Sequence, residues 1–129
     1  MNNVELVQKG YQHFSEGKLD ALRELFHPDI IWQECQGFPF IEGDGVFKDP
    51  EAIVQGVLSQ LPTHYNGFSI AIQELFGSGE KVVMVGHYLG VYKETGKPFK
   101  ANATHVWTVK NGKLAHFFVA VDTAEIINP

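Results

Sequence analysis

The stretch THVWTVKNGKLAHFFVAVD, residues 104–122, has the pattern of a β-hairpin. Asn111-Gly112 is the strongest short signal for a two-residue turn between antiparallel strands, and it places Lys110 opposite Lys113. The hairpin also contains two histidines, a tryptophan and an aspartate, none of which it needs for folding. These groups either decorate the surface or line a cavity.

Register decides between these two possibilities, because side chains alternate between the faces of a sheet. The two-residue turn places His105 opposite Phe118. One face is then expected to carry Ala101, Ala103, His105, Trp107, His116, Phe118, Ala120 and Asp122. Small alanines beside aromatic and polar groups indicate room for a ligand. Pairing across the preceding loop adds His87 to this face, although a bulge would exchange the two faces.

The order of the remaining elements predicts an α+β fold. Apolar residues at helical spacing and cap signals at Asn2 and Asp49 predict helices over residues 4–14, 19–26 and 50–61. Strands are expected over residues 29–34, 68–76, 81–92, 98–109 and 113–121. This order favours three N-terminal helices packed on one face of a curved, mostly antiparallel sheet with one apolar cavity. Residues 1–129 are expected to form a single domain.

Composition argues against several classes of partner. The net charge is −5 and the ten Lys and Arg residues are scattered, which argues against nucleic-acid and anionic-membrane binding. No apolar stretch approaches membrane-spanning length. One cysteine and an N-terminus without a signal-peptide pattern favour the cytoplasm. The dispersed glycines and separated histidines predict no cofactor and no metal.

Three segments carry a resemblance to a known family: EGKLDALRELFHPDIIWQE (16–34), GVFKDPEAI (45–53) and HVWTVKNGKLAHFF (105–118). In order and spacing they resemble the SnoaL-like branch of the nuclear-transport-factor-2-like superfamily, which includes ketosteroid isomerase and polyketide cyclases. The resemblance covers nearly the whole chain. It implies a cone-shaped fold, a small apolar ligand in a deep cavity, and a homodimer formed through the outer face of the sheet.

The resemblance also implies candidate catalytic residues. Glu34 matches the catalytic carboxylate of ketosteroid isomerase, and Asn102 matches the neutral acid of its oxyanion hole. His105 and Asp122 match the histidine and aspartate that polyketide cyclases use in proton transfer. Glu34 or Asp122 is the expected base, with His105, Asn102 or Tyr11 as the donor. The expected pocket wall consists of Tyr11, Phe14, Trp32, His87, Trp107 and Phe118.

Two functions remain open at this stage. The first is a small cofactor-free enzyme, an isomerase or a cyclase, that transfers a proton on an apolar carbonyl-bearing substrate. The alternative is a non-catalytic small-molecule-binding or accessory module with the same pocket. The isomerase's essential tyrosine corresponds to Gly10, and both this and Asn102 favour the alternative. An enzyme requires polar groups that converge on one point of the cavity, whereas a binding module has internally satisfied ones.

Overall fold

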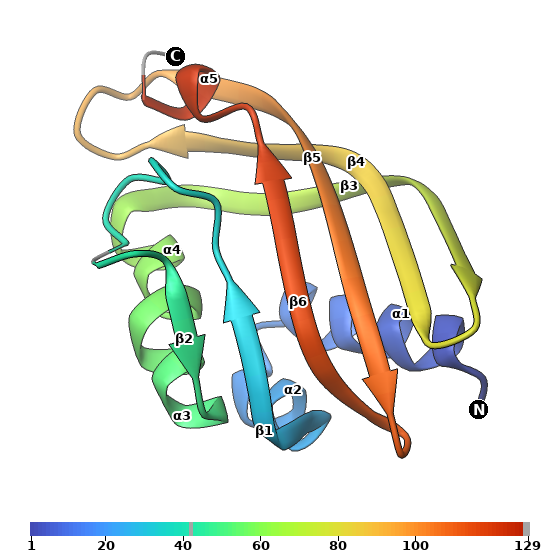
Figure 1. Cartoon of the computed structure of the whole chain (residues 1–129). Coiled ribbons are helices and arrows are strands. Elements are labelled where there is room, and N and C mark those ends of the chain that lie inside the picture. The colour runs from blue at the N-terminus through green and yellow to red at the C-terminus, as the bar shows by residue number, and fades with distance from the viewer. Residues whose placement is uncertain (42, 128–129) are drawn as a thin grey trace.

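Figure 1 shows a curved six-stranded sheet with helices α1 and α2 behind it. The computed structural model describes residues 1–41 and 43–127. The helices are α1 (Asn3–Ser15), α2 (Leu19–Glu24), α3 (Pro50–Ile53), the π-helical η1 (Val54–Leu58), α4 (Gln60–His64) and α5 (Thr123–Ile127). The strands are β1 (Phe26–Gln33), β2 (Val46–Lys48), β3 (Tyr65–Ser78), β4 (Lys81–Tyr92), β5 (Pro98–Lys110) and β6 (Lys113–Val121).

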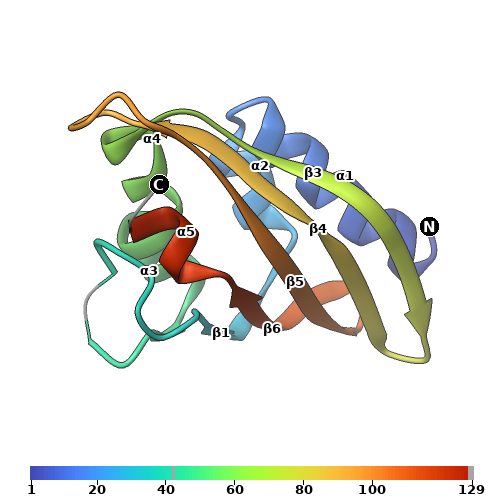
Figure 2. The ribbon, with the colours of Figure 1, turned by 90° about the horizontal axis from the view of Figure 1, so that it is seen from above.

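The strand order is β2-β1-β6-β5-β4-β3, and β1 beside β6 is the parallel pair. The expected α+β class and the curved, mostly antiparallel sheet are confirmed. Figure 2 shows from above how the sheet bends between β3 and β6. Strand β2 and helix α5 are additions to the expected elements. The expected third helix is the continuous run α3, η1 and α4.

Capping residues set the helix starts. The Asn2 side chain accepts the Glu5 backbone N–H at 2.8 Å, and Glu5 accepts the Asn2 backbone N–H at 3.2 Å, which completes a capping box. The Asp49 side chain accepts the Ala52 N–H at 3.2 Å, directly before Pro50. The two helical segments that flank the cavity therefore begin where the sequence predicts.

The 111–112 turn forms as expected, but the register expected for β6 is wrong beyond Leu114. Lys110 pairs with Lys113 and Val109 with Leu114, and then a bulge leaves Ala115 without a partner. Trp107 consequently lies opposite Phe117 rather than His116, and His105 lies opposite Val119 rather than Phe118. The one-residue slip exchanges the faces of β6, so Phe117 and Val119 point inward and Phe118 points outward.

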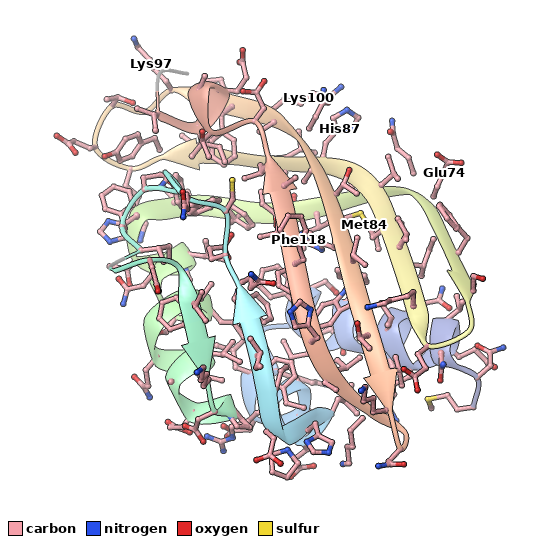
Figure 3. All side chains as sticks on the ribbon, viewed as in Figure 1. Glu74, Met84, His87, Lys97, Lys100 and Phe118 are labelled. Atoms are coloured by element: carbon pink, nitrogen blue, oxygen red, sulfur yellow. The ribbon has the colours of Figure 1, made fainter. Side chains whose placement is uncertain are left out.

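The register expected for β4 is also off by one residue. His87 pairs with Asn102 instead of Ala103, so it lies on the outer face. Figure 3 shows His87 and Phe118 on the side of the sheet away from the helices. The inward positions of β4 include Met84 and Tyr88, both of them buried.

The space beside the two alanines of β5 is occupied by protein. Ala101 and Ala103 belong to a buried apolar cluster that also contains Phe38 and Ile126. Helix α5, which carries Ile126, packs against β5. The cavity therefore lies further along the sheet, beside His105 and Trp107.

Because of the bulge, the adjacent residues Phe117 and Phe118 are expected to contribute very differently to stability. Phe117 is 1% exposed and its ring lies 3.9 Å from that of Trp32, whereas Phe118 is 46% exposed. Phe117→Ala is expected to lower the free energy of unfolding by about 3–5 kcal/mol. Phe118→Ala is expected to cost much less, as measured by urea denaturation. A larger loss of unfolding free energy for Phe118→Ala than for Phe117→Ala would contradict the bulge and support the register without it.

Candidate functional site

An apolar cavity lies between the sheet, α1 and the α3–α4 region. It has about 50 Å³ of volume accessible to water, enough for a few water molecules. Its wall is mostly aromatic and aliphatic, and its lining comprises Gly10, Tyr11, Phe14, Leu22, Trp32, Glu34, Phe38, Val57, Leu58, Leu61, Phe68, Ile70, Tyr88, His105, Trp107 and Phe117. Ionisable side chains in such a wall are poorly solvated, which shifts their pKa values.

His105 is held on both sides by tyrosines. Its Nδ1 lies 2.6 Å from the Tyr11 hydroxyl and its Nε2 lies 2.5 Å from the Tyr88 hydroxyl. The side chain is 2% exposed, and burial lowers its pKa from 6.5 to about 3. The imidazole is therefore neutral at physiological pH and acts as a bridge between the two hydroxyls.

Glu34 is positioned by the end of β1 and by the return of the chain at Gly45. Its backbone N–H donates to the Gly45 carbonyl at 2.7 Å. Gly45 has φ of 82°, and a Cβ at this position would lie 2.8 Å from the Glu34 carbonyl oxygen, so glycine is required there. The carboxylate accepts from Trp32 Nε1 at 3.2 Å and from the Cys35 N–H at 3.1 Å.

The electrostatic environment of Glu34 favours the protonated form relative to water. Burial raises the pKa of Glu34, and the hydrogen bonds from Trp32 and Cys35 oppose this only in part. The ion pairs found in the described part of the chain join Lys18 to Glu16 and Arg23 to Asp20 and Glu51, so none of them involves Glu34. A carboxyl group with a raised pKa and no fixed cation is suited to proton transfer near neutral pH.

Tyr88 shares the cavity with Glu34. Burial, followed by the negative charge of Glu34, raises the pKa of Tyr88 well above 10, so the hydroxyl keeps its proton. Burial likewise raises the pKa of Tyr11, whose oxygen accepts from Trp107 Nε1 at 2.9 Å. The cavity thus combines one carboxyl group with a protonated hydroxyl in an apolar wall, and such a pair can remove a proton and stabilise an oxyanion.

Four of the expected site residues lie outside this cavity. Asn102 and Asp122 are exposed, and the Asp122 backbone N–H donates to the Asn102 carbonyl at 3.0 Å. His87 and Phe118 lie on the outer face because of the two register errors. Six of the expected residues, by contrast, line the cavity: Tyr11, Phe14, Trp32, Glu34, His105 and Trp107.

Tyr88, which contacts His105 and lines the cavity, was not among the residues predicted from the sequence. Strand β4 is apolar on both faces, since Val83 and Val85 alternate with Val82 and Met84. Periodicity alone therefore does not identify the inward face. A correct pairing of Val91 with Pro98 beside the loop would have placed Tyr88 inside. Phe38 and Phe68 are further lining residues that were not expected.

Within residues 1–41 and 43–127, no three His, Cys, Asp or Glu side chains come together as metal ligands. None of the described helices combines the length and apolar character needed to cross a bilayer.

The fold and cavity define a member of the cone-shaped α+β class. Residues 7–117 match the family model of the SnoaL-like domain, so the chain belongs to that family. An NTF2-like protein from Burkholderia thailandensis E264 is 31% identical, with a TM-score of 0.89 over 96% of this chain and 93% of that one. Among curated proteins, none matches this sequence.

Two more distant structures share the fold. TerC, co-crystallised with polyporic acid, is 23% identical, with a TM-score of 0.85 over 97% of this chain and 95% of that one. IdmH from Streptomyces antibioticus, a proposed polyketide cyclase, is 18% identical, with a TM-score of 0.79 over 98% and 96%.

Burial of the neutral imidazole predicts a pH-dependent stability. Because His105 has a lower pKa folded than unfolded, the unfolded state binds the extra proton between about pH 6.5 and pH 3. Stability should fall as the pH drops through this range. His105→Asn lacks this titrating group. Between pH 7.5 and pH 4, the free energy of unfolding of the wild type should therefore fall by roughly 3 kcal/mol more than that of His105→Asn. Urea unfolding at both pH values measures this, and a constant difference between the proteins would contradict it.

Proposed function

We propose that this protein catalyses proton transfer on a small apolar carbonyl compound, with Glu34 as the base and Tyr88 as the hydrogen-bond donor to the carbonyl oxygen. The supporting observation is that both groups line one apolar cavity, where each has a raised pKa. The same parts serve isomerisation and ring closure, which are the reaction types of ketosteroid isomerase and the polyketide cyclases. Asp122 and Asn102 have no role in this proposal because they are exposed.

In this mechanism, ionised Glu34 takes a proton from the carbon next to the carbonyl group. The electrons of that C–H bond form the C=C bond of an enolate, and the negative charge moves to oxygen. Tyr88 donates a hydrogen bond to that oxygen, and the surrounding apolar wall strengthens the bond by excluding water. For isomerisation, Glu34 then returns the proton to another carbon of the substrate. For ring closure, the enolate carbon attacks a second carbonyl group, whose π electrons move to its oxygen, and protonated Glu34 gives its proton to that oxygen.

The free volume of the cavity bears on the size of the substrate. About 50 Å³ holds only part of a polycyclic molecule. Phe14 and Phe68, with ring centroids 6.3 Å apart, line the cavity and also two surface grooves beside it. We infer that the reacting carbonyl end enters the cavity while the rest of the substrate lies along one of these grooves.

A binding module remains the second candidate, supported by one specific observation. Both ring nitrogens of His105 already have protein partners, so the imidazole has no free position for a ligand. In that case Glu34 and Tyr88 would bind a polar group without acting on it. Exchange of substrate hydrogen with solvent separates the two functions, because only a catalyst breaks the C–H bond.

Replacement of Glu34 tests the enzymatic proposal. With β-tetralone in D₂O, wild-type protein should catalyse deuterium incorporation next to the carbonyl, followed by NMR. Glu34→Gln should abolish this activity, and Tyr88→Phe should reduce it about 100-fold. The wild-type rate should fall at acid pH with an apparent pKa above the usual 4.5 of a glutamate, because burial raises the pKa of Glu34.

The matched control is the exposed carboxylate of Asp122, since Asp122→Asn should retain full exchange activity. Glu34→Gln should also keep or raise the thermal midpoint, because an ionised carboxylate with a raised pKa destabilises the folded state above its unfolded pKa. Binding of β-tetralone without wild-type exchange would favour the binding module instead.

The homodimer and the cytoplasmic location stay predictions, but the structure changes the residues expected at the dimer interface. Phe117 and Val119, which an unbulged hairpin would place on the outer face, are buried inside. A row of paired residues instead crosses five strands on the outside: Val83, Val106, Phe118, Gln33 and Val46. Phe118 and Val46 are 46% and 40% exposed, and a row in which four of five residues are apolar suits a second copy of the chain.

Sedimentation velocity at micromolar concentration tests this interface. The wild type is expected to sediment as a dimer, and Phe118→Glu as a monomer with native circular dichroism. Lys110→Glu, at the exposed end of the hairpin and outside the row, is the control and should remain dimeric. A monomeric wild type would exclude the dimer.

A further inference from the structure

Four buried side chains form a continuous hydrogen-bonded chain along the cavity wall. Trp107 Nε1 lies 2.9 Å from the Tyr11 hydroxyl, which lies 2.6 Å from His105 Nδ1. His105 Nε2 in turn lies 2.5 Å from the Tyr88 hydroxyl. The distances alone leave the direction of the chain open, because a hydroxyl and a neutral imidazole each donate one hydrogen and accept another.

Trp107 removes this ambiguity, because an indole N–H can only donate. The Tyr11 oxygen must accept from it, and the one Tyr11 hydrogen then has His105 Nδ1 as its partner. If Nδ1 carried the hydrogen instead, two donors would point at the Tyr11 oxygen. Either tautomer leaves one tyrosine hydrogen to the cavity, but only the Nδ1–H form places two donors on one phenolic oxygen while the Tyr88 oxygen accepts from neither ring nitrogen.

We propose that Trp107, acting through Tyr11, holds His105 as the Nε2–H tautomer, so that Tyr88 accepts from His105 and presents its own hydrogen to the cavity. Trp107, Tyr11 and His105 are positioning residues in this arrangement, and Tyr88 is the group that touches the ligand. The tautomer itself is independent of any activity. Its catalytic consequence rests on the proposed function above.

The direction of hydrogen bonding from Trp107 to Tyr88 decides whether Tyr88 donates to a ligand or accepts from it. With Nε2–H donating to its oxygen, the Tyr88 hydrogen is free for a carbonyl, enolate or phenolate oxygen. In the opposite direction Tyr88 would give its single hydrogen to His105 and could only accept from a ligand. Aligned donors also polarise one another, so the last hydroxyl of the chain is a stronger donor than an isolated tyrosine.

Burial keeps the His105 imidazole neutral near neutral pH, so the direction of the hydrogen bonds does not change there. The imidazole is enclosed by Tyr11 from α1, Tyr88 from β4 and Phe117 from β6. Phe117 is apolar and both tyrosines have raised pKa values, so none of these three neighbours of the ring is charged at neutral pH. His105 therefore stays neutral, and its single N–H hydrogen stays on Nε2.

Nuclear magnetic resonance of ¹⁵N-histidine-labelled protein tests the proposal directly. Wild-type His105 should show one protonated Nε2 and one unprotonated Nδ1 in a long-range ¹H–¹⁵N spectrum, unchanged between pH 6 and pH 8. Trp107→Phe removes the donor that sets the direction, so signals of the Nδ1–H tautomer should appear. Trp32→Phe is the matched control: its ring lies 5.8 Å from that of Trp107 in the same core, but it donates to Glu34, so the tautomer should not change.

Binding of para-nitrophenol, whose absorbance distinguishes phenol from phenolate, measures the consequence at Tyr88. Trp107→Phe should bind the phenolate form more weakly than Trp32→Phe does. In the exchange assay, Trp107→Phe should lose kcat while its KM stays near that of the wild type. A structural defect alone would change binding of neutral phenol and phenolate alike.

The wild-type spectrum decides the proposal even if Trp107→Phe does not fold. An Nδ1–H wild type, or a tautomer that Trp107→Phe leaves unchanged, would overturn it while the case for Glu34 stands. Conversely, the wild type could show the Nε2–H tautomer while Glu34→Gln keeps full exchange activity. That result would support the direction of the hydrogen bonds and contradict the proposed function. The two failures are therefore distinguishable.

Discussion

The site depends on the burial of one neutral imidazole between two tyrosine hydroxyls. His105 sits on β5, Tyr11 on α1 and Tyr88 on β4, so their contacts join the first helix to the middle of the sheet. A buried polar group without partners costs free energy, and each of these three groups satisfies the others. Displacement of α1 would leave His105 Nδ1 and Trp107 Nε1 unpaired at once. The hydrogen-bonded chain therefore fixes the position of α1 more specifically than apolar packing alone.

Glu34, which also lines the cavity, is held by contacts at the end of β1. Strand β1 ends beside it, Trp32 donates to one carboxylate oxygen, and the Cys35 N–H donates to the other. The ring of Trp32 also packs on Phe117 and Trp107, so the carboxylate position is coupled to the same core that contains His105. The donor Tyr88 is consequently carried by β4, and the base Glu34 directly follows the last residue of β1, where the hydrogen bonds from Trp32 and Cys35 orient it.

Local sequence signals predicted the helices and strands, whereas long-range packing determined which side chains of each strand point toward the core. Asn111-Gly112 specified its turn because both residues must adopt positive φ, which this pair does with values of 51° and 71°. The bulge at Ala115 had no such signal, because Phe117 and Phe118 are equally apolar and either one could face the core. What selects Phe117 is the space between Trp32 and Trp107, which exists only once β1 lies parallel to β6. Alternation on β5 placed His105 and Trp107 on one face, whereas the apolar character of both faces of β4 hid Tyr88.

His105 and Glu34 differ in how they affect the stability of the fold. His105 is neutral and fully paired, so its presence is compatible with stability near neutral pH, and a structural role accounts for it without a ligand. Glu34 is different: the balance of its burial and its hydrogen bonds still raises its pKa, so its ionised form destabilises the folded protein at neutral pH. A glutamine could keep the bond from Trp32 without that cost. Stability therefore does not explain a carboxylate at this position, whereas abstraction of a proton beside a carbonyl group requires a base, which an ionised carboxylate supplies.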